Sequence, residues 1–80
     1  MFHMKQLKQD IFDGAPDWVK SAAIDGNGEV WLHETTKHDM WADTMADMWG
    51  FGYDGRSQIF FDDGYDTTNW KTSVIDREVL

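Results

Sequence analysis

WVKSAAIDGNGEVWLHE, the stretch at residues 18–34, decides the fold of this chain. Two runs rich in apolar residues, 18–24 and 29–34, are separated by Asp25-Gly26-Asn27-Gly28. Asp-Gly and Asn-Gly supply the positive φ angles that tight hairpin turns require. In the second run, Val30 and Leu32 alternate with other side chains, as in a strand with one buried face. The stretch therefore predicts an antiparallel β-hairpin.

Helical spacing occurs on both sides of this hairpin. Within residues 2–12, Met4, Leu7 and Ile11 recur at i, i+3 and i+7, which predicts a short amphipathic helix. Residues 38–49 carry Trp and Met side chains at helical spacing and are followed by a glycine, the usual residue at a helix end. We expect a second helix there.

Two further segments complete the predicted fold. Residues 57–61 indicate a short strand, and residues 66–77 fit either a last helical segment or a closing strand at Val74-Ile75. The predicted fold class is α+β: a small antiparallel β-sheet of three or four strands packed against one or two short helices, in a single domain of residues 1–80. The predicted core consists of large apolar side chains from every segment: Leu7, Ile11, Trp18, Ile24, Val30, Leu32, Trp41, Met45, Ile59, Phe61, Trp70 and Val74.

Composition excludes several classes of function. The 80 residues carry 15 acids against 7 bases, a formal net charge of −8, and no cysteine. Such a charge argues against direct nucleic-acid binding and against a polybasic membrane-surface protein. No apolar run reaches the roughly 20 residues of a membrane span, and Met1 to Lys5 contain no signal-peptide apolar region. We expect a soluble cytoplasmic protein.

Three aspartates form the sharpest feature of the sequence. Asp39, Asp43 and Asp47 are spaced i, i+4 and i+8 in the predicted helix 38–49, which would stack them on one side. Like charges at this spacing destabilise a helix, and that segment holds no Lys or Arg. One interpretation is a row of carboxylates that imitates phosphates and enters a basic groove of a partner. The other is a solvated face that keeps a small domain dispersed.

Aromatic side chains suggest where a partner would be anchored. Five Trp in 80 residues exceed what a small core hides completely, so some indole surface is expected outside. Trp41, Trp49 and Tyr53 are the candidates, because Trp and Tyr favour interfaces and also stack on planar ligands. Asp62 and Asp63 extend the acidic stretch beyond the predicted helix.

Motifs for catalysis or metal binding are not evident. The three histidines lack a metal-ligand spacing, and no serine lies in a Gly-x-Ser-x-Gly elbow. Residues 25–36 do not match a calcium loop, since Val30 and Thr36 stand where glycine and glutamate are needed. We therefore expect no enzyme, no cofactor and no bound metal.

The tail Asn69-Trp70-Lys71-Thr72-Ser73-Val74-Ile75-Asp76-Arg77 resembles the ending of small phage-encoded accessory proteins of unknown function. Their pattern runs Asp/Asn-Trp-x-x-Ser-Leu/Ile-Ile-x-Arg, from which Val74 departs. Residues 16–28 resemble a second shared piece, a Pro-x-Trp followed by Ala-x-Asp before a turn. The two pieces cover about a third of the chain and leave residues 35–56 outside. The resemblance implies a phage product in a bacterial cytoplasm and implies no activity.

These observations favour stoichiometric binding over catalysis. The first hypothesis is an acidic inhibitor that docks on the basic surface of a host bacterial protein, such as a defence or nucleic-acid-processing protein. An alternative is a protein that sequesters a small nucleotide signal at Trp70, Ser73 and Arg77, which share one side of a helix at i, i+3 and i+7. The plainer interpretation gives these three residues packing, capping and ion-pair roles. A further alternative is a minor structural or assembly protein that forms homo-oligomers.

Overall fold

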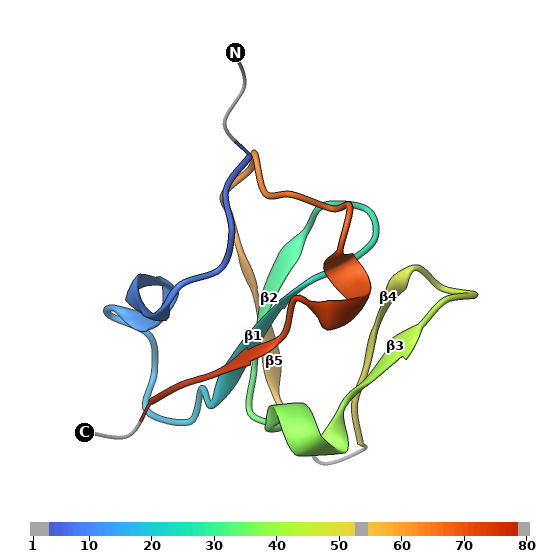
Figure 1. Cartoon of the computed structure of the whole chain (residues 1–80). Coiled ribbons are helices and arrows are strands. Elements are labelled where there is room, and N and C mark those ends of the chain that lie inside the picture. Colours follow the sequence, from blue (N-terminus) through green and yellow to red (C-terminus); the bar gives the residue numbers. More distant parts are fainter. Residues whose placement is uncertain (1–3, 53–54, 79–80) are drawn as a thin grey trace.

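The predicted hairpin forms the centre of a four-stranded antiparallel sheet (Figure 1). The structure is a computed structural model that describes residues 4–52 and 55–78. Strand β1, Ser21–Ile24, pairs with β2, Val30–His33, across a turn in which the Asp25 N–H donates to the Glu29 carbonyl at 2.8 Å. Gly28 has a φ of 91°, so the glycine supplies the left-handed conformation that the sequence predicted.

Two outer strands flank this hairpin. Strand β5, Ser57–Phe60, pairs with β2 and confirms the strand predicted at 57–61. Strand β6, Ile75–Asp76, pairs with β1, which gives the sheet order β5-β2-β1-β6. Of the two structures left open for residues 66–77, the closing strand is therefore the one that forms, preceded by the short 3₁₀ turn η3 at Trp70–Thr72.

The helix predicted at 38–49 is wrong. A 3₁₀ turn, η2 at Lys37–Asp39, leads into a second two-stranded sheet of β3, Trp41–Asp43, and β4, Met48–Gly50. The Asp43 carboxylate accepts hydrogen bonds from the Met45 N–H at 3.1 Å and the Ala46 N–H at 3.2 Å, which folds the chain back. Asp47 has a φ of 54°, in the left-handed region. These turn interactions replace the helical ones.

The N-terminal helix predicted at 2–12 is also wrong over most of its length. Of the described residues in this range, only η1, Gln9–Phe12, is helical, as one 3₁₀ turn. Lys5 instead forms a parallel bridge with Tyr65, in which the Lys5 N–H donates to the Gly64 carbonyl at 2.8 Å. Since the described residues contain short 3₁₀ turns and no α-helix, the protein is mostly a small β domain, and the α half of the predicted α+β class is not found.

The core follows the sheet and departs from the predicted list at its margins. Six predicted core residues are buried: Ile11, Ile24, Val30, Leu32, Trp70 and Val74. Leu7, Trp18 and Ile59 are half-buried. Trp41, Met45 and Phe61 are exposed, because the helix that would have turned the first two inward does not form and Phe61 lies beyond the end of β5. Phe12, Val19 and Trp49 join the core instead.

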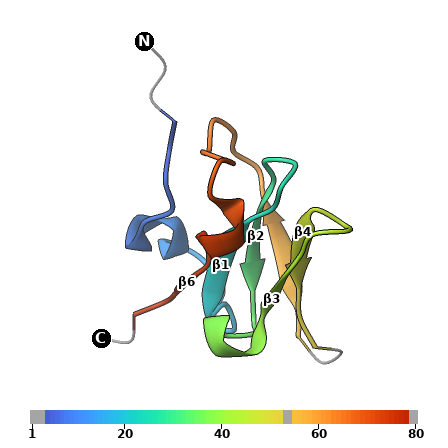
Figure 2. The same cartoon turned by 45° about the vertical axis from the view of Figure 1, so that its right-hand side comes forward.

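Trp49 joins the second hairpin to the central sheet. Its indole Nε1–H lies 3.0 Å from the Ile24 carbonyl and 3.1 Å from the Trp70 carbonyl, and its backbone N–H donates to the Asp25 carboxylate at 3.0 Å. The ring also meets that of Trp70 edge-on, with centroids 6.3 Å apart. Burial raises the pKa of Asp25, while the bond from Trp49 partly offsets this. Both β4 and η3 therefore pack against β1 (Figures 1 and 2).

Replacing Trp49→Phe should destabilise the protein by about 2–3 kcal/mol, because two buried carbonyls lose an indole donor and the ring shrinks. Urea unfolding measures this loss. The matched control is Trp41→Phe at the exposed indole, for which we expect a change within about 0.5 kcal/mol. Equal effects at the two positions would contradict the structural role given to Trp49.

Candidate functional site

The outward face of the β3–β4 hairpin is the most distinctive surface of the molecule. Ala42 pairs with Trp49 on the side packed against the core, so Trp41 and Met48 lie on the opposite side. Trp41 is 54% exposed, Met48 43%, and Met45, in the connecting turn, 97%. Figure 1 shows this hairpin to one side of the four-stranded sheet. We name Trp41, Met45 and Met48 the hairpin patch.

Gly50 allows the Trp41 indole to lie flat on the neighbouring strand. The two residues are paired across the hairpin, and any Cβ at position 50 would collide with the Trp41 ring. An aromatic side chain over a cross-strand glycine is a known way to stabilise such a pair. The indole is thus held in one place although half of its surface faces solvent, which is the state of a preorganised contact residue.

Acidic side chains lie in the same segment as the hairpin patch. Asp39 is exposed in η2, Asp43 is half-buried at the end of β3, and Asp47 is exposed just before β4. Residues 39–52 contain no Lys, Arg or His, so this segment supplies no base that would neutralise these acids. The predicted single stripe along a helix is wrong, because strand β3 and the turn that follows it separate the three carboxylates. They accompany exposed Trp and Met side chains instead.

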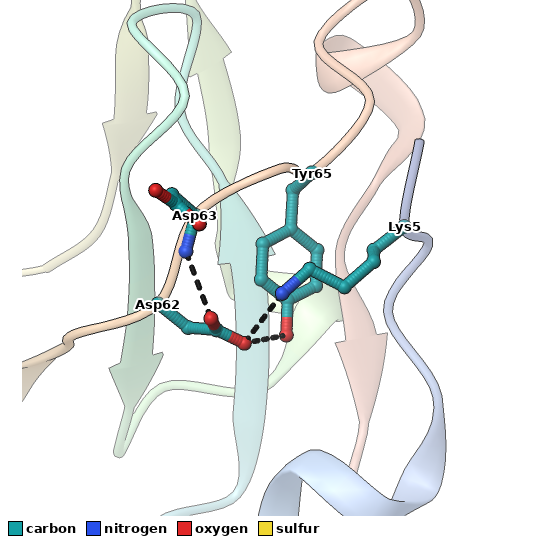
Figure 3. Close-up of polar contacts among 4 residues, drawn as sticks. All are labelled: Lys5, Asp62, Asp63 and Tyr65. Atoms are coloured by element: carbon teal, nitrogen blue, oxygen red, sulfur yellow. Dashed lines mark hydrogen bonds and ion pairs between the residues drawn. The ribbon is translucent and has the colours of Figure 1, made fainter. Parts of the chain in front are cut away.

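Asp62 and Asp63 do not belong to the hairpin; they lie in the loop after β5 (Figure 3). Asp62 accepts a hydrogen bond from the Lys5 Nζ at 2.7 Å and another from the Tyr65 hydroxyl at 3.4 Å. The Lys5 ammonium also sits 4.7 Å from the centre of the Tyr65 ring. The bond from Lys5 lowers the pKa of Asp62, which keeps it ionised and paired within the chain. Asp62 thus fastens the N-terminal segment.

The structure describes two of the three predicted aromatic anchors, Trp41 and Trp49. Trp49 is only 6% exposed, because the hairpin turns it inward, so its assignment as a surface anchor is wrong. Tyr53 lies outside the described residues. Trp41 is the predicted anchor that does lie on the surface, and Met45 and Met48 join it there without having been singled out as binding residues.

The alternative ligand site, Trp70, Ser73 and Arg77, is occupied by contacts within the chain. Trp70 is 8% exposed and packs on Trp49. The Ser73 hydroxyl accepts from the Ile24 N–H at 2.9 Å and lies 2.7 Å from the Trp70 carbonyl, so it continues the edge of β1 beyond β6. The Arg77 guanidinium donates to backbone carbonyls of the segment before β1, those of Phe12, Pro16 and Val19. These contacts match the plainer interpretation of packing and capping, but with Arg77 on carbonyls rather than in an ion pair.

Ser73→Ala should therefore lower stability by about 1–2 kcal/mol, since the buried Ile24 N–H loses its partner. Thr72→Ala is the matched control, because the exposed Thr72 hydroxyl donates to the Asn69 carbonyl at 3.1 Å, a bond within the same turn. We expect that control to stay within about 0.5 kcal/mol in urea unfolding. An unchanged stability in Ser73→Ala would argue against a structural role.

His33 is a buried titratable side chain whose pKa is lowered by its surroundings. It is 2% exposed, neither ring nitrogen has a hydrogen-bond partner among the described residues, and its ring lies 4.9 Å from that of Phe51. Burial disfavours the imidazolium and lowers the pKa of His33 to about 4. His33 is thus a neutral packing residue on β2.

This pKa makes stability depend on pH. Because the unfolded chain binds the His33 proton near pH 6.5 and the folded one only near pH 4, folding should lose about 3 kcal/mol as the pH falls through that window. His33→Phe removes the contribution while keeping a ring, and both proteins retain Asp25, whose raised pKa acts in the opposite direction. Urea unfolding at a series of pH values measures the difference. Parallel curves for the two proteins would contradict the assignment.

Searches for metal sites, for membrane spans and for similar proteins assign no further function to the described residues. Within residues 4–52 and 55–78, no group of three or more His, Asp or Glu side chains could hold a metal ion. Nor does any helix in that part of the chain have the length and apolar character needed to cross a membrane. No protein family, curated protein or solved structure matches this chain.

Proposed function

We propose that this protein acts by stoichiometric binding, as a phage-type inhibitor of a host bacterial protein in the cytoplasm. The observation that carries the proposal is the hairpin patch. Trp41, Met45 and Met48 expose three large apolar side chains within eight residues, and the segment around them contains acids and no base. The resemblance of the tail to phage accessory proteins supports the cellular setting, and the surface supports the mode of action.

The hairpin patch has the composition of a binding hot spot. Interfaces concentrate their energy in a few large side chains, Trp above all, surrounded by polar residues that exclude water. Methionine adds flexible apolar surface that adapts to a partner. Because Gly50 already holds the Trp41 indole in place, binding loses less side-chain entropy than it would with a free rotamer.

The acids indicate the chemistry of the partner. Asp39, Asp43 and Asp47 lie in the same segment as the hairpin patch, on a protein of net charge −8, so a basic surface is the complementary one. Carboxylates at such a surface occupy the positions of phosphates, which makes a nucleic-acid-binding groove of a host protein a suitable target. Their field also accelerates the encounter at low salt.

The nucleotide-sequestering alternative has no specific observation in its favour. It requires Arg77 and Ser73 to face a ligand, but both are bonded to backbone groups of the chain.

Among the acids proposed for binding, Asp62 is paired with Lys5. The acids of the hairpin are therefore the ones to which we assign the electrostatic contribution.

The test is capture of host protein from a bacterial lysate with the double variant Asp43→Asn, Asp47→Asn. Asparagine keeps the acceptor oxygen that Asp43 uses in the turn and tolerates the left-handed φ of Asp47, so the hairpin should remain folded. We expect the captured protein to elute as salt rises and its affinity to fall by about tenfold or more in the variant.

The matched control is Asp13→Asn, Asp17→Asn, which removes the same two charges from exposed positions in the segment between η1 and β1. It should leave the affinity unchanged. A further variant, Trp41→Ala, should weaken the complex at every salt concentration, because it removes apolar contact rather than charge. Equal losses in the two double variants would show a general charge effect and contradict a specific hairpin site.

A further inference from the structure

The two edges of the four-stranded sheet differ in whether their outward backbone N–H and C=O groups are paired. At β6, the Gln9 side-chain amide forms the hydrogen bonds that a neighbouring strand would form. Its Nε2 donates to the Asp76 carbonyl at 2.8 Å, and its Oε1 accepts from the Glu78 N–H at 3.0 Å. This amide satisfies the backbone groups that an edge strand would otherwise expose. At the other edge, β5, none of the described residues provides such a cover.

The hydrogen-bond pattern shows which groups of β5 face outward. The Glu34 N–H donates to the Arg56 carbonyl at 2.8 Å, and bonded positions alternate along an antiparallel pair. Gln58 and Phe60 therefore bond to β2, while the N–H and C=O groups of Ser57 and Ile59 point away from the sheet. Within the described part of the chain, these outward groups have no hydrogen-bond partner.

The sequence of β5 lacks the usual protection of an edge strand. Natural edges carry Lys, Pro or a bulge that discourages pairing with another chain. Residues 57–61, Ser-Gln-Ile-Phe-Phe, contain no charge, no proline and no glycine, and Phe61 at their end is 90% exposed. An open backbone edge beside an exposed phenyl ring is suited to the addition of a strand.

Charge identifies the occupant. Arg56 precedes β5, is bonded to Glu34 and keeps 60% of its side chain exposed. After the strand, Asp62 is bonded to Lys5, while the exposed Asp63 is in no ion pair among the described residues. When two copies of β5 pair antiparallel, Asp63 of each copy lies toward the Arg56 end of the other. The strands themselves are uncharged, so the ladder contains no like-charge pair. The edge is thus complementary to itself.

We propose that β5 is a self-association edge, at which a second copy of this chain pairs antiparallel about a two-fold axis. Ser57 of each copy lies opposite Ile59 of the other, which satisfies the outward N–H and C=O groups of both residues. The two four-stranded sheets become continuous, and Phe61 is covered at each end of the ladder. This surface is separate from the hairpin patch, so it stands independently of the proposed function.

The test is the mass in solution as a function of concentration, by light scattering or sedimentation. The wild-type mass should rise from 9.3 kDa toward twice that value as the concentration increases from about 5 to about 500 µM. Ser57→Lys and Phe61→Lys should each shift this transition to at least about tenfold higher concentration, because a lysine charges the edge. Both reduce the net negative charge, so a weaker dimer cannot come from greater overall repulsion.

Met45→Lys is the control, since it makes the same change at the exposed tip of the second hairpin and should leave the transition unchanged. Amide hydrogen exchange provides a second measurement, in which the Ile59 N–H should gain protection as the dimer forms. A monomer throughout the range overturns the proposal. So does a dimer that withstands both edge variants, that leaves the Ile59 amide unprotected, or that is broken by Met45→Lys.

Discussion

The hydrogen bonds of Trp49 are the constraint on which the rest of the structure depends. A two-stranded hairpin is marginal in water by itself, so β3 and β4 need an attachment to the central sheet. The Trp49 indole N–H provides it by donating to two backbone carbonyls, one from β1 and one from η3, while the Trp49 backbone N–H donates to the buried Asp25 carboxylate. One residue thus connects the first turn, the second hairpin and the tail.

This attachment also produces the exposed surface. Since alternate residues of a strand face opposite sides, turning Trp49 inward places Met48 and its cross-strand neighbours outward. The same hairpin therefore contributes a core residue and a candidate binding patch. The tail residues Trp70 and Ser73 support the inner side of this arrangement, because Trp70 packs on Trp49 and Ser73 caps the edge of β1.

The regions that could be predicted from sequence are those in which local chemistry decides. Asp-Gly and Asn-Gly select the first turn, and the run at 57–61 has few alternatives to a strand. The helix predicted at 38–49 was wrong because its spacing is ambiguous. The spacing of four positions that puts Met45 and Trp49 on one helical face is also the spacing from the tip of the turn to strand β4. Asp43 favours the turn, since its carboxylate bonds the backbone two and three residues ahead. Met45 and Met48 were consequently missed as surface residues.

By itself the sequence determined the central hairpin, the β5 strand, half of the core and the acidic character of the molecule, because turn residues, alternation and charge act over a few residues. The tertiary structure alone decided which aromatic residues face outward, which aspartates are free, and that β5 keeps an open edge while Gln9 covers β6. These properties depend on pairings between residues far apart in the chain, such as Gln9 with Asp76 and Lys5 with Asp62, which no local pattern encodes.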